Sequence, residues 1–181
     1  MYAFFPIFID HSTSWEQYLR SIALRVNKER EAERIIRRMI ILEQDARKKL
    51  APVTKQGKWV IIRLLPNNCR LYGVSEHSLT ELFYDRLQFQ CDERVTHAIY
   101  KDNALEHLIE LNPENIFIIW SEESEVNALA TNTLWKNLRA VRENRVYYPE
   151  SREWDPWGPI GREHMIRELK RYFTKNAAFA Y

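Results

Sequence analysis

The sequence predicts a three-layer α/β/α lobe with a central, mostly parallel sheet, preceded by one long helix. Two continuous apolar runs, residues 59–62 and 116–119, have the composition of strands that are buried on both faces. Segments with helical spacing alternate with these and other strand-like segments, which is the order typical of the α/β class. A third observation is the amphipathic stretch 29–50, whose apolar residues recur every three or four positions.

The composition is that of a folded protein with a sizeable core. The 181 residues are 45% hydrophobic and 13% aromatic, with only 4 Gly and 7 Pro, which argues against disorder. The net charge of +2 is close to balance, so we expect no direct contact with nucleic acid. We expect an N-terminal strand and helix (1–27), a linking helix (28–52) and an α/β lobe (53–181).

The cysteines and the N-terminus say little about the compartment. Cys69 and Cys91 are the only cysteines and do not form a CxxC pair, so two buried thiols are favoured over a zinc site or a disulfide. This pattern mildly favours a reducing compartment. The N-terminus lacks the basic region of a signal peptide, and no apolar run approaches the roughly 20 residues that span a membrane.

The N-terminal segment is predicted to be mainly helical. The apolar residues 4–9 fit either a strand or a linker. Thr13 and Glu16 have the spacing of a capping box, which predicts a helix over 14–26. Residues 27–28 interrupt this helix before the long one begins.

As a helix, the stretch 29–50 would be about 33 Å long. Charged residues, including Glu43, are expected on its solvent face, and Pro52 is expected to end it. The apolar stripe consists of Ala32, Ile35, Ile36, Met39, Leu42, Ala46 and Leu50. Two readings remain open: a surface helix of a globular domain, or a rigid helix that links two lobes.

Strands and helices alternate over the rest of the chain. The predicted strands are 59–62, 70–74, 95–100, 115–120 and 145–148. The first two are expected to pair as a hairpin. The predicted helices are 78–87, 105–111, 122–130, 134–141 and 160–173. An aromatic-rich loop precedes the last helix.

The expected binding site lies beyond the carboxyl ends of the strands, where ligands sit in open α/β sheets. That rule selects Arg63 after the first strand, Trp120 after the strand 115–120, and the loop that carries Trp154 and Trp157. Arg63 is either the partner of a core carboxylate or an exposed cation in a cleft. The two loop tryptophans either form an aromatic wall for a ligand or cap the core.

Three further residues are weaker candidates for ligand contact. His97 and Lys101 precede a helix and are expected to reach the same edge of the sheet. Arg162 lies in the first turn of the last helix, where N–H groups favour anions, although a solvated position fits equally well. No other residue has metal-site spacing with His97, so we expect no metal site. No GxSxG, P-loop, GxGxxG or HExxH pattern occurs, and we expect no enzyme.

Several motifs occur in an order that resembles a known family. Residues 70–73 read RLYG, residues 82–87 read LFYDRL with Gln88 where a glycine is usual, and residues 104–118 read ALEHLIELNPENIFI. The most specific segment is 132–147, NTLWKNLRAVRENRVY. Together they resemble the C-terminal half of the substrate-binding proteins of iron-siderophore and vitamin B12 uptake. The same fold occurs as the sensor half of AraC-type transcriptional regulators.

The resemblance implies a ligand cleft between two lobes, of which this chain supplies the C-terminal one. The family's ligands are ferric siderophores, often anionic and held by Arg, Lys and aromatic residues, so iron is expected only inside the chelate. Arg63 matches a ligand-binding position of the family, and we expect Arg70 and Tyr72 of the RLYG stretch to contact ligand as well. Glu106 matches a carboxylate that pairs with a permease Arg in transport members, although it also fits an ordinary exposed helix residue.

Two settings and one alternative function remain open. In an iron-uptake protein, the partners would be the missing N-terminal lobe and an ABC permease, and the protein would be an extracytoplasmic lipoprotein. In an AraC-type regulator, the chain would be cytoplasmic and joined to a DNA-binding domain. The alternative is an interaction or dimerisation module without a small-molecule ligand, which would dock through apolar residues of the first helix and of 4–9.

Overall fold

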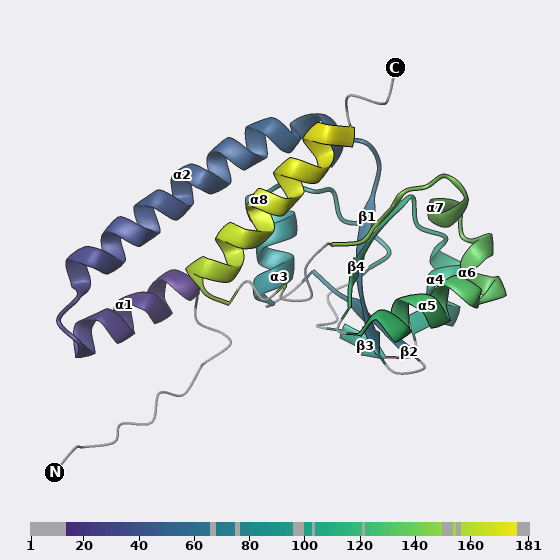
Figure 1. Ribbon diagram of the computed structural model, residues 1–181, viewed down its shortest axis with the longest axis horizontal. Helices are drawn as coiled ribbons and strands as arrows, with labels where there is room; N and C mark the ends of the chain where they lie inside the picture. The colour runs from purple at the N-terminus through teal and green to yellow at the C-terminus, as the bar shows by residue number, and fades with distance from the viewer. Residues whose placement is uncertain are drawn as a thin grey trace, which may run out of the picture.

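A mixed five-stranded sheet forms the centre of the protein in the computed structural model (Figure 1). The structure describes residues 14–65, 68–74, 77–95, 100–102, 104–120, 122–149, 154 and 157–176. The strand order is β3-β2-β1-β4-β5. The strands are β1 (Trp59–Leu65), β2 (Asn68–Tyr72), β3 (Tyr100–Asp102), β4 (Asn115–Ile119) and β5 (Val146–Tyr147). Only β2 runs against the others, because it pairs antiparallel with β1 and β3 while β1, β4 and β5 pair in parallel. The predicted mostly parallel sheet and the hairpin are therefore confirmed.

Both faces of the sheet are buried, as the continuous apolar runs predicted. Along β1, Trp59 and Ile61 enter one hydrophobic core, whereas Val60, Ile62 and Leu64 enter another on the opposite face. Because successive side chains of a strand point to opposite faces, such a strand needs a helical layer on each side. The predicted three-layer arrangement follows from this alternation.

Different helices cover the two faces, which Figure 1 shows on either side of the strands. The face to which Trp59 and Ile61 point carries helices from both ends of the chain. These are α1 (Trp15–Arg25), α2 (Glu29–Thr54), α3 (Ser78–Thr80), its π-helical continuation η1 (Glu81–Arg86) and α8 (Pro159–Asn176). The second face carries α4 (Ala104–Leu111), α5 (Glu123–Thr131), α6 (Thr133–Asn137) and α7 (Arg139–Arg142). The long helix α2 lies alongside α8 and extends past the sheet, where α1 folds back along it (Figure 1).

The helix starts and ends differ from prediction at two points. Ser14 caps α1 by accepting the N–H of Gln17, while Thr13 lies outside the described residues. Pro52 lies inside α2, which continues to Thr54. A proline this close to the end removes one helical hydrogen bond, and the burial of Leu50 and Thr54 holds the last turn in place.

Two predicted elements need correction. The helix expected over 134–141 is split into α6 and α7 at Leu138, whose extended ψ of 140° interrupts the helical path. The strand expected over 95–100 overlaps β3 at Tyr100, while Val95 lies in a turn and residues 96–99 lie outside the described residues. At Gln88 the φ of 64° is left-handed, a conformation that glycine adopts without steric cost. The apolar segment 4–9 lies outside the described residues.

Candidate ligand-binding site

Two arginines face each other at the end of the β1–β2 hairpin. Arg63 is directly opposite Arg70 in the antiparallel register, and the next pair on the same face is Ile61 with Tyr72. Ile61 and Tyr72 belong to the core under α2 and α8, so the two arginines lie on that face of the sheet. Like charges directly opposite each other destabilise a sheet, so this pair favours an anionic partner.

Arg63 has an unmet hydrogen-bonding need. Its side chain is half-buried, and its Nε atom is buried without a hydrogen-bond partner among the described residues. A buried donor of a charged group costs more than a neutral one when it is left unpaired. Of the two readings of Arg63, this favours the cation in a cleft over the partner of a core carboxylate.

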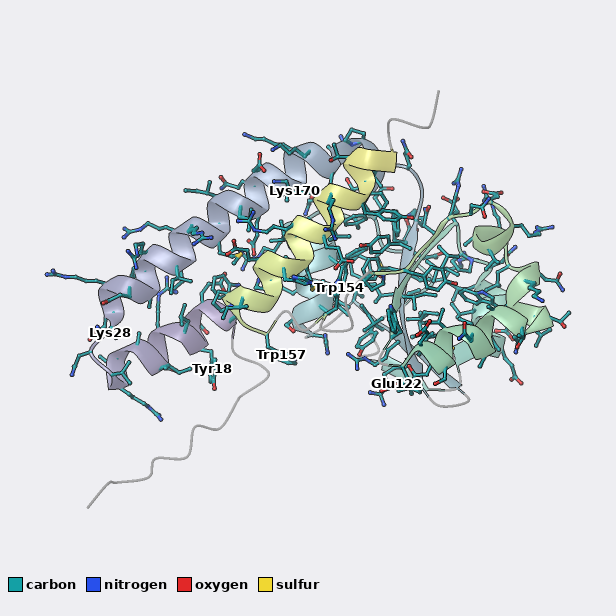
Figure 2. All side chains as sticks on the ribbon, in the orientation of Figure 1. Tyr18, Lys28, Glu122, Trp154, Trp157 and Lys170 are labelled. Carbon is teal, nitrogen blue, oxygen red and sulfur yellow. The ribbon has the colours of Figure 1, made fainter. Side chains whose placement is uncertain are left out.

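A row of three aromatic rings continues from the arginine pair. The centroids of Tyr72 and His77 are 4.9 Å apart, and those of His77 and Trp157 are 5.4 Å apart, both in edge-to-face geometry. Tyr72 is two positions from Arg70 on β2 and on the same face. Trp157 is half-buried just before α8 (Figure 2). Cationic and aromatic groups are thus adjacent on one face.

Trp154 is part of the core and not of this row. Only 3% of its surface is exposed, and its Nε1 donates to Oε2 of Glu168 at 2.6 Å. Its ring packs against Phe117 and Tyr147, with centroids 4.6 and 5.8 Å away. Of the two readings of this tryptophan, capping of the core is the correct one.

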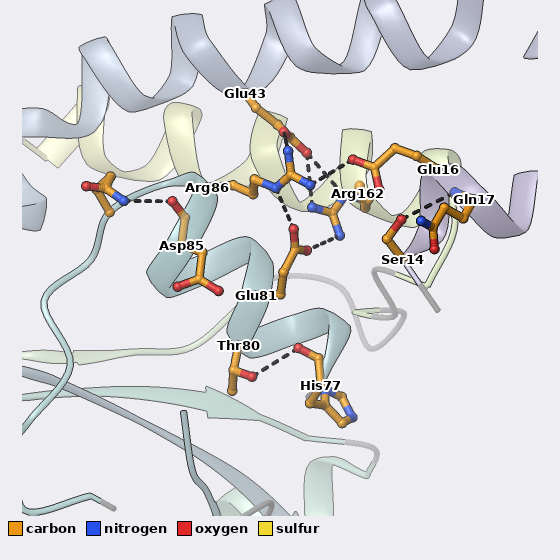
Figure 3. A network of polar contacts seen from close by, with 11 residues as sticks. Ser14, Glu16, Gln17, Glu43, His77, Thr80, Glu81, Asp85, Arg86 and Arg162 are labelled. Carbon is orange, nitrogen blue, oxygen red and sulfur yellow. Dashed lines mark hydrogen bonds and ion pairs between the residues drawn. The ribbon is translucent and has the colours of Figure 1, made fainter. Parts of the chain in front are cut away.

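Arg162 is buried in an ion network rather than placed to bind an anion (Figure 3). None of its surface is exposed, its Nη2 lies 3.0 Å from Oε1 of Glu43, and its Nη1 lies 2.8 Å from Oε2 of Glu81. Arg86 extends the network to Glu81 and, at 2.8 Å, to Glu16. Both readings of Arg162, an anion site and a solvated position, are therefore wrong in this structure.

The ion network joins α1, α2, η1 and α8 through three carboxylates and two guanidinium groups. Burial is the largest influence on Glu43 and raises the pKa of its carboxyl, although Arg162 and Arg86 oppose that shift. Glu43 was expected on a solvated face, so this residue is also a correction. The guanidinium carbon of Arg162 lies 5.3 Å from the ring centre of Trp15, which adds a cation–π contact.

Of the remaining predicted residues, Trp120 and Glu106 lie away from the Arg63 group. Trp120 packs against the core on the other face, and its Nε1 donates to the carbonyl of Pro149 at 3.1 Å. Lys101 is opposite Leu71 in the register, not opposite Arg70. His97 lies outside the described residues. Glu106 is exposed on α4 and lines an open hollow of about 610 Å³ together with Leu64, Leu65, Cys69, Leu105, Glu125, Ala128, Leu129, Asn132 and Leu134.

His77 lies at the centre of the aromatic row but was not among the predicted site residues. Its Nδ1 accepts the N–H of Leu79 at 3.2 Å, so it caps α3. A polar residue directly before a predicted helix was a usable signal for such a cap. Nothing local in the sequence indicated that its ring would meet Tyr72 and Trp157.

The described part of the chain carries neither a metal-ligand cluster nor a membrane-spanning helix. No group of three or more His, Cys, Asp or Glu side chains there has the arrangement of a metal site. No helix there is both long and apolar enough to cross a membrane. Cys69 is buried and Cys91 is half-buried, and neither forms a disulfide.

Comparison with known proteins identifies the family. The family model described as "Periplasmic binding protein" matches residues 4–153, which is most of the chain. The chain belongs to the periplasmic binding protein family. The predicted resemblance is thus confirmed, and the family and fold are those of substrate-binding proteins.

Two curated relatives come from Bacillus subtilis strain 168. The iron-uptake system-binding protein is 29% identical over 146 residues, covering 75% of this chain and 45% of the relative. The HTH-type transcriptional activator Btr is 25% identical over 167 residues, covering 90% of this chain and 31% of the relative. The chain therefore spans less than half the length of either relative.

A solved structure shows the same fold. It is the triscatecholate siderophore-binding protein FeuA from Bacillus subtilis in complex with ferri-bacillibactin, and it superposes with a TM-score of 0.80 at 23% identity. The match covers 93% of this chain and 62% of that protein.

Proposed function

We propose that this chain forms the C-terminal half of a cleft that binds an anionic ferric siderophore. The observation that carries the proposal is Arg63, a half-buried cation whose Nε has no partner among the described residues, directly opposite Arg70. An anionic chelate would accept the unpaired hydrogen bond of Arg63 and be attracted by the positive charge of Arg63 and Arg70 together. The half-buried rings of His77 and Trp157 would line the side of the same chelate, with the buried ring of Tyr72 behind them.

The relatives support this ligand class. One is an iron-uptake system-binding protein, and the FeuA structure holds ferri-bacillibactin, a triscatecholate chelate. Ferric tris-catecholate complexes carry several negative charges, which suits a site with two guanidinium groups. Iron would enter only inside the chelate, and the site would bind it without catalysis.

The other wall of the cleft would come from an N-terminal lobe. The relatives are longer than this chain, and α1 with the first half of α2 extends beyond the sheet, where another lobe would join. In this arrangement α2 is the linking helix between two lobes.

Two biological settings fit the proposal. In an ABC-transport setting, the exposed carboxylate of Glu106 would pair with an Arg of the permease, as its place in the motif 104–118 implies. In a regulator, a DNA-binding domain of the same polypeptide would read the state of the cleft, a setting that the match to Btr supports.

Titration with ferri-bacillibactin tests the binding proposal. Arg63→Ala should weaken binding by about ten- to hundredfold, because a hydrogen bond to a charged group is worth about 1.5–3 kcal/mol. Tryptophan fluorescence quenching gives the dissociation constants. Arg142→Ala is the matched control, since Arg142 is exposed on α7 at the other face of the sheet. Absence of saturable quenching with any ferric siderophore in a protein that contains both lobes, or equal binding by the Arg63 variant, would refute the proposal.

A second candidate is self-association through exposed apolar side chains. Leu24 on α1 and Ile41 on α2 are each 66% exposed. Val26, at the end of α1, is 56% exposed. If they mark an interface between copies, light scattering after size exclusion should show a dimer that Ile41→Lys dissociates. A monomer at high concentration would exclude this second candidate.

A further inference from the structure

His77 is held in one orientation by contacts on both sides of its ring. The Tyr72 and Trp157 rings meet it edge-to-face at interplanar angles of 61° and 63°. Such geometry is favourable because the positive edge of one ring meets the negative face of the next. His77 is therefore the middle member of the row, in contact with both Tyr72 and Trp157.

The cap on α3 fixes the same ring from the backbone side. Nδ1 of His77 accepts the N–H of Leu79, so the neutral ring carries its proton on Nε2. The carbonyl of His77 accepts the hydroxyl of Thr80 at 3.0 Å and the N–H of Glu81 at 2.9 Å (Figure 3). Rotation of the ring away from Trp157 would break the cap.

We propose that His77 is a specificity-determining residue that makes the cleft prefer catecholate chelates to hydroxamate chelates. This inference rests on the proposed function of the same site. A catecholate siderophore presents flat aromatic rings, which the half-buried rings of His77 and Trp157 can contact edge-to-face, while the buried Tyr72 ring supports His77. A hydroxamate siderophore offers aliphatic linkers and no ring, so it gains little from the row. The half-buried His77 ring touches the chelate and also contacts Trp157.

Two substitutions separate the ring from the cap. His77→Asn keeps a good capping acceptor but removes the ring. His77→Phe keeps a ring but removes the acceptor. Calorimetric titration with ferri-bacillibactin and with the hydroxamate chelate ferrioxamine B measures the preference of each variant. The melting temperature in thermal unfolding measures how much the cap on α3 stabilises the protein.

His77→Asn should bind ferri-bacillibactin about three- to tenfold more weakly, the range expected for one lost aromatic contact. Its binding of ferrioxamine B and its melting temperature should stay near those of the parent. His77→Phe should melt at a lower temperature and retain the catecholate preference. The proposal is overturned if His77→Asn keeps the parent's preference for ferri-bacillibactin over ferrioxamine B. It is also overturned if His77→Phe loses this preference as fully as His77→Asn does.

The Arg63→Ala variant distinguishes this proposal from the proposed function. Suppose that the parent binds ferri-bacillibactin and that Arg63→Ala weakens this binding. If His77→Asn then binds the chelate as well as the parent does, only the role of His77 is refuted. If a protein that contains both lobes binds no ferric siderophore, both proposals are refuted together.

Discussion

At the scale of single residues, Glu43 shows burial outweighing two neighbouring cations. Burial raises the pKa of its carboxyl above the ordinary value of 4.5, although Arg162 and Arg86 favour the charged form. Within the ion network, three carboxylates face two guanidinium groups, so a proton on Glu43 would balance the charge. The carboxyl thus binds its proton more tightly in the folded than in the unfolded protein.

This raised pKa predicts a pH dependence of stability. Above pH 4.5 the folded state holds more protons at Glu43 than the unfolded state, so its contribution to stability falls as pH rises through the folded pKa. Glu43→Gln cannot titrate, so its free energy of unfolding should improve relative to the parent between pH 4.5 and 7. Urea unfolding at several pH values measures the difference.

Glu163→Gln is a control with the opposite sign. Arg167 and Arg38 lower the pKa of Glu163, so its contribution is present above pH 4.5 and lost as pH falls through the folded pKa. This variant should therefore lose stability relative to the parent as pH rises. A Glu43→Gln curve parallel to that of the parent would contradict the account of Glu43.

At the scale of elements, Arg162 ties α8 to α2 and η1. Removing one partner of a buried ion pair typically costs about 3–5 kcal/mol, because the remaining charges stay buried. Arg162→Met should therefore lower the free energy of unfolding by about that amount. Arg167→Met on the same helix breaks only a largely exposed pair with Glu163 and should cost less than about 1 kcal/mol. Equal effects of the two variants would show that the ion network does not hold these helices together.

Elements with a strong local signal were predictable from the sequence, and long-range partners were not. The apolar runs 59–62 and 116–119 specify strands buried on both faces, and the structure has them in β1 and β4. Glu43 and Arg162 are 119 positions apart, and each lies in a helix where a charged residue normally faces solvent. Their mutual burial depends on how α2 packs on α8, which no local pattern encodes.

The candidate site was predictable to a similar extent. The strand-end rule selected Arg63, and the hairpin placed Arg70 and Tyr72 beside it. The same rule selected Trp120, which lies one residue beyond β4. Its side chain packs on the face of the sheet opposite to Arg63. His77 joins the site through a tertiary contact with Trp157, so its role emerges only in the folded protein.

At the scale of the whole molecule, the two faces of the sheet have different proposed roles. The face under α2 and α8 carries the arginine pair and the aromatic row, and the opposite face carries α4 to α7 with Glu106 (Figure 1). A ligand should therefore disturb the end of the β1–β2 hairpin and the start of α8, while the second helical layer stays unchanged.

Amide chemical-shift mapping would show which face of the sheet contacts the ligand. Gallium(III)-bacillibactin is a diamagnetic analogue of the ferric chelate and allows nitrogen–proton correlation spectra of this 21.8 kDa chain. The account predicts shifts grouped at Arg63, Arg70, Tyr72, His77 and Trp157, with α4 to α7 unaffected. Shifts centred on the hollow beside Glu106, or no shifts at saturating chelate, would contradict it.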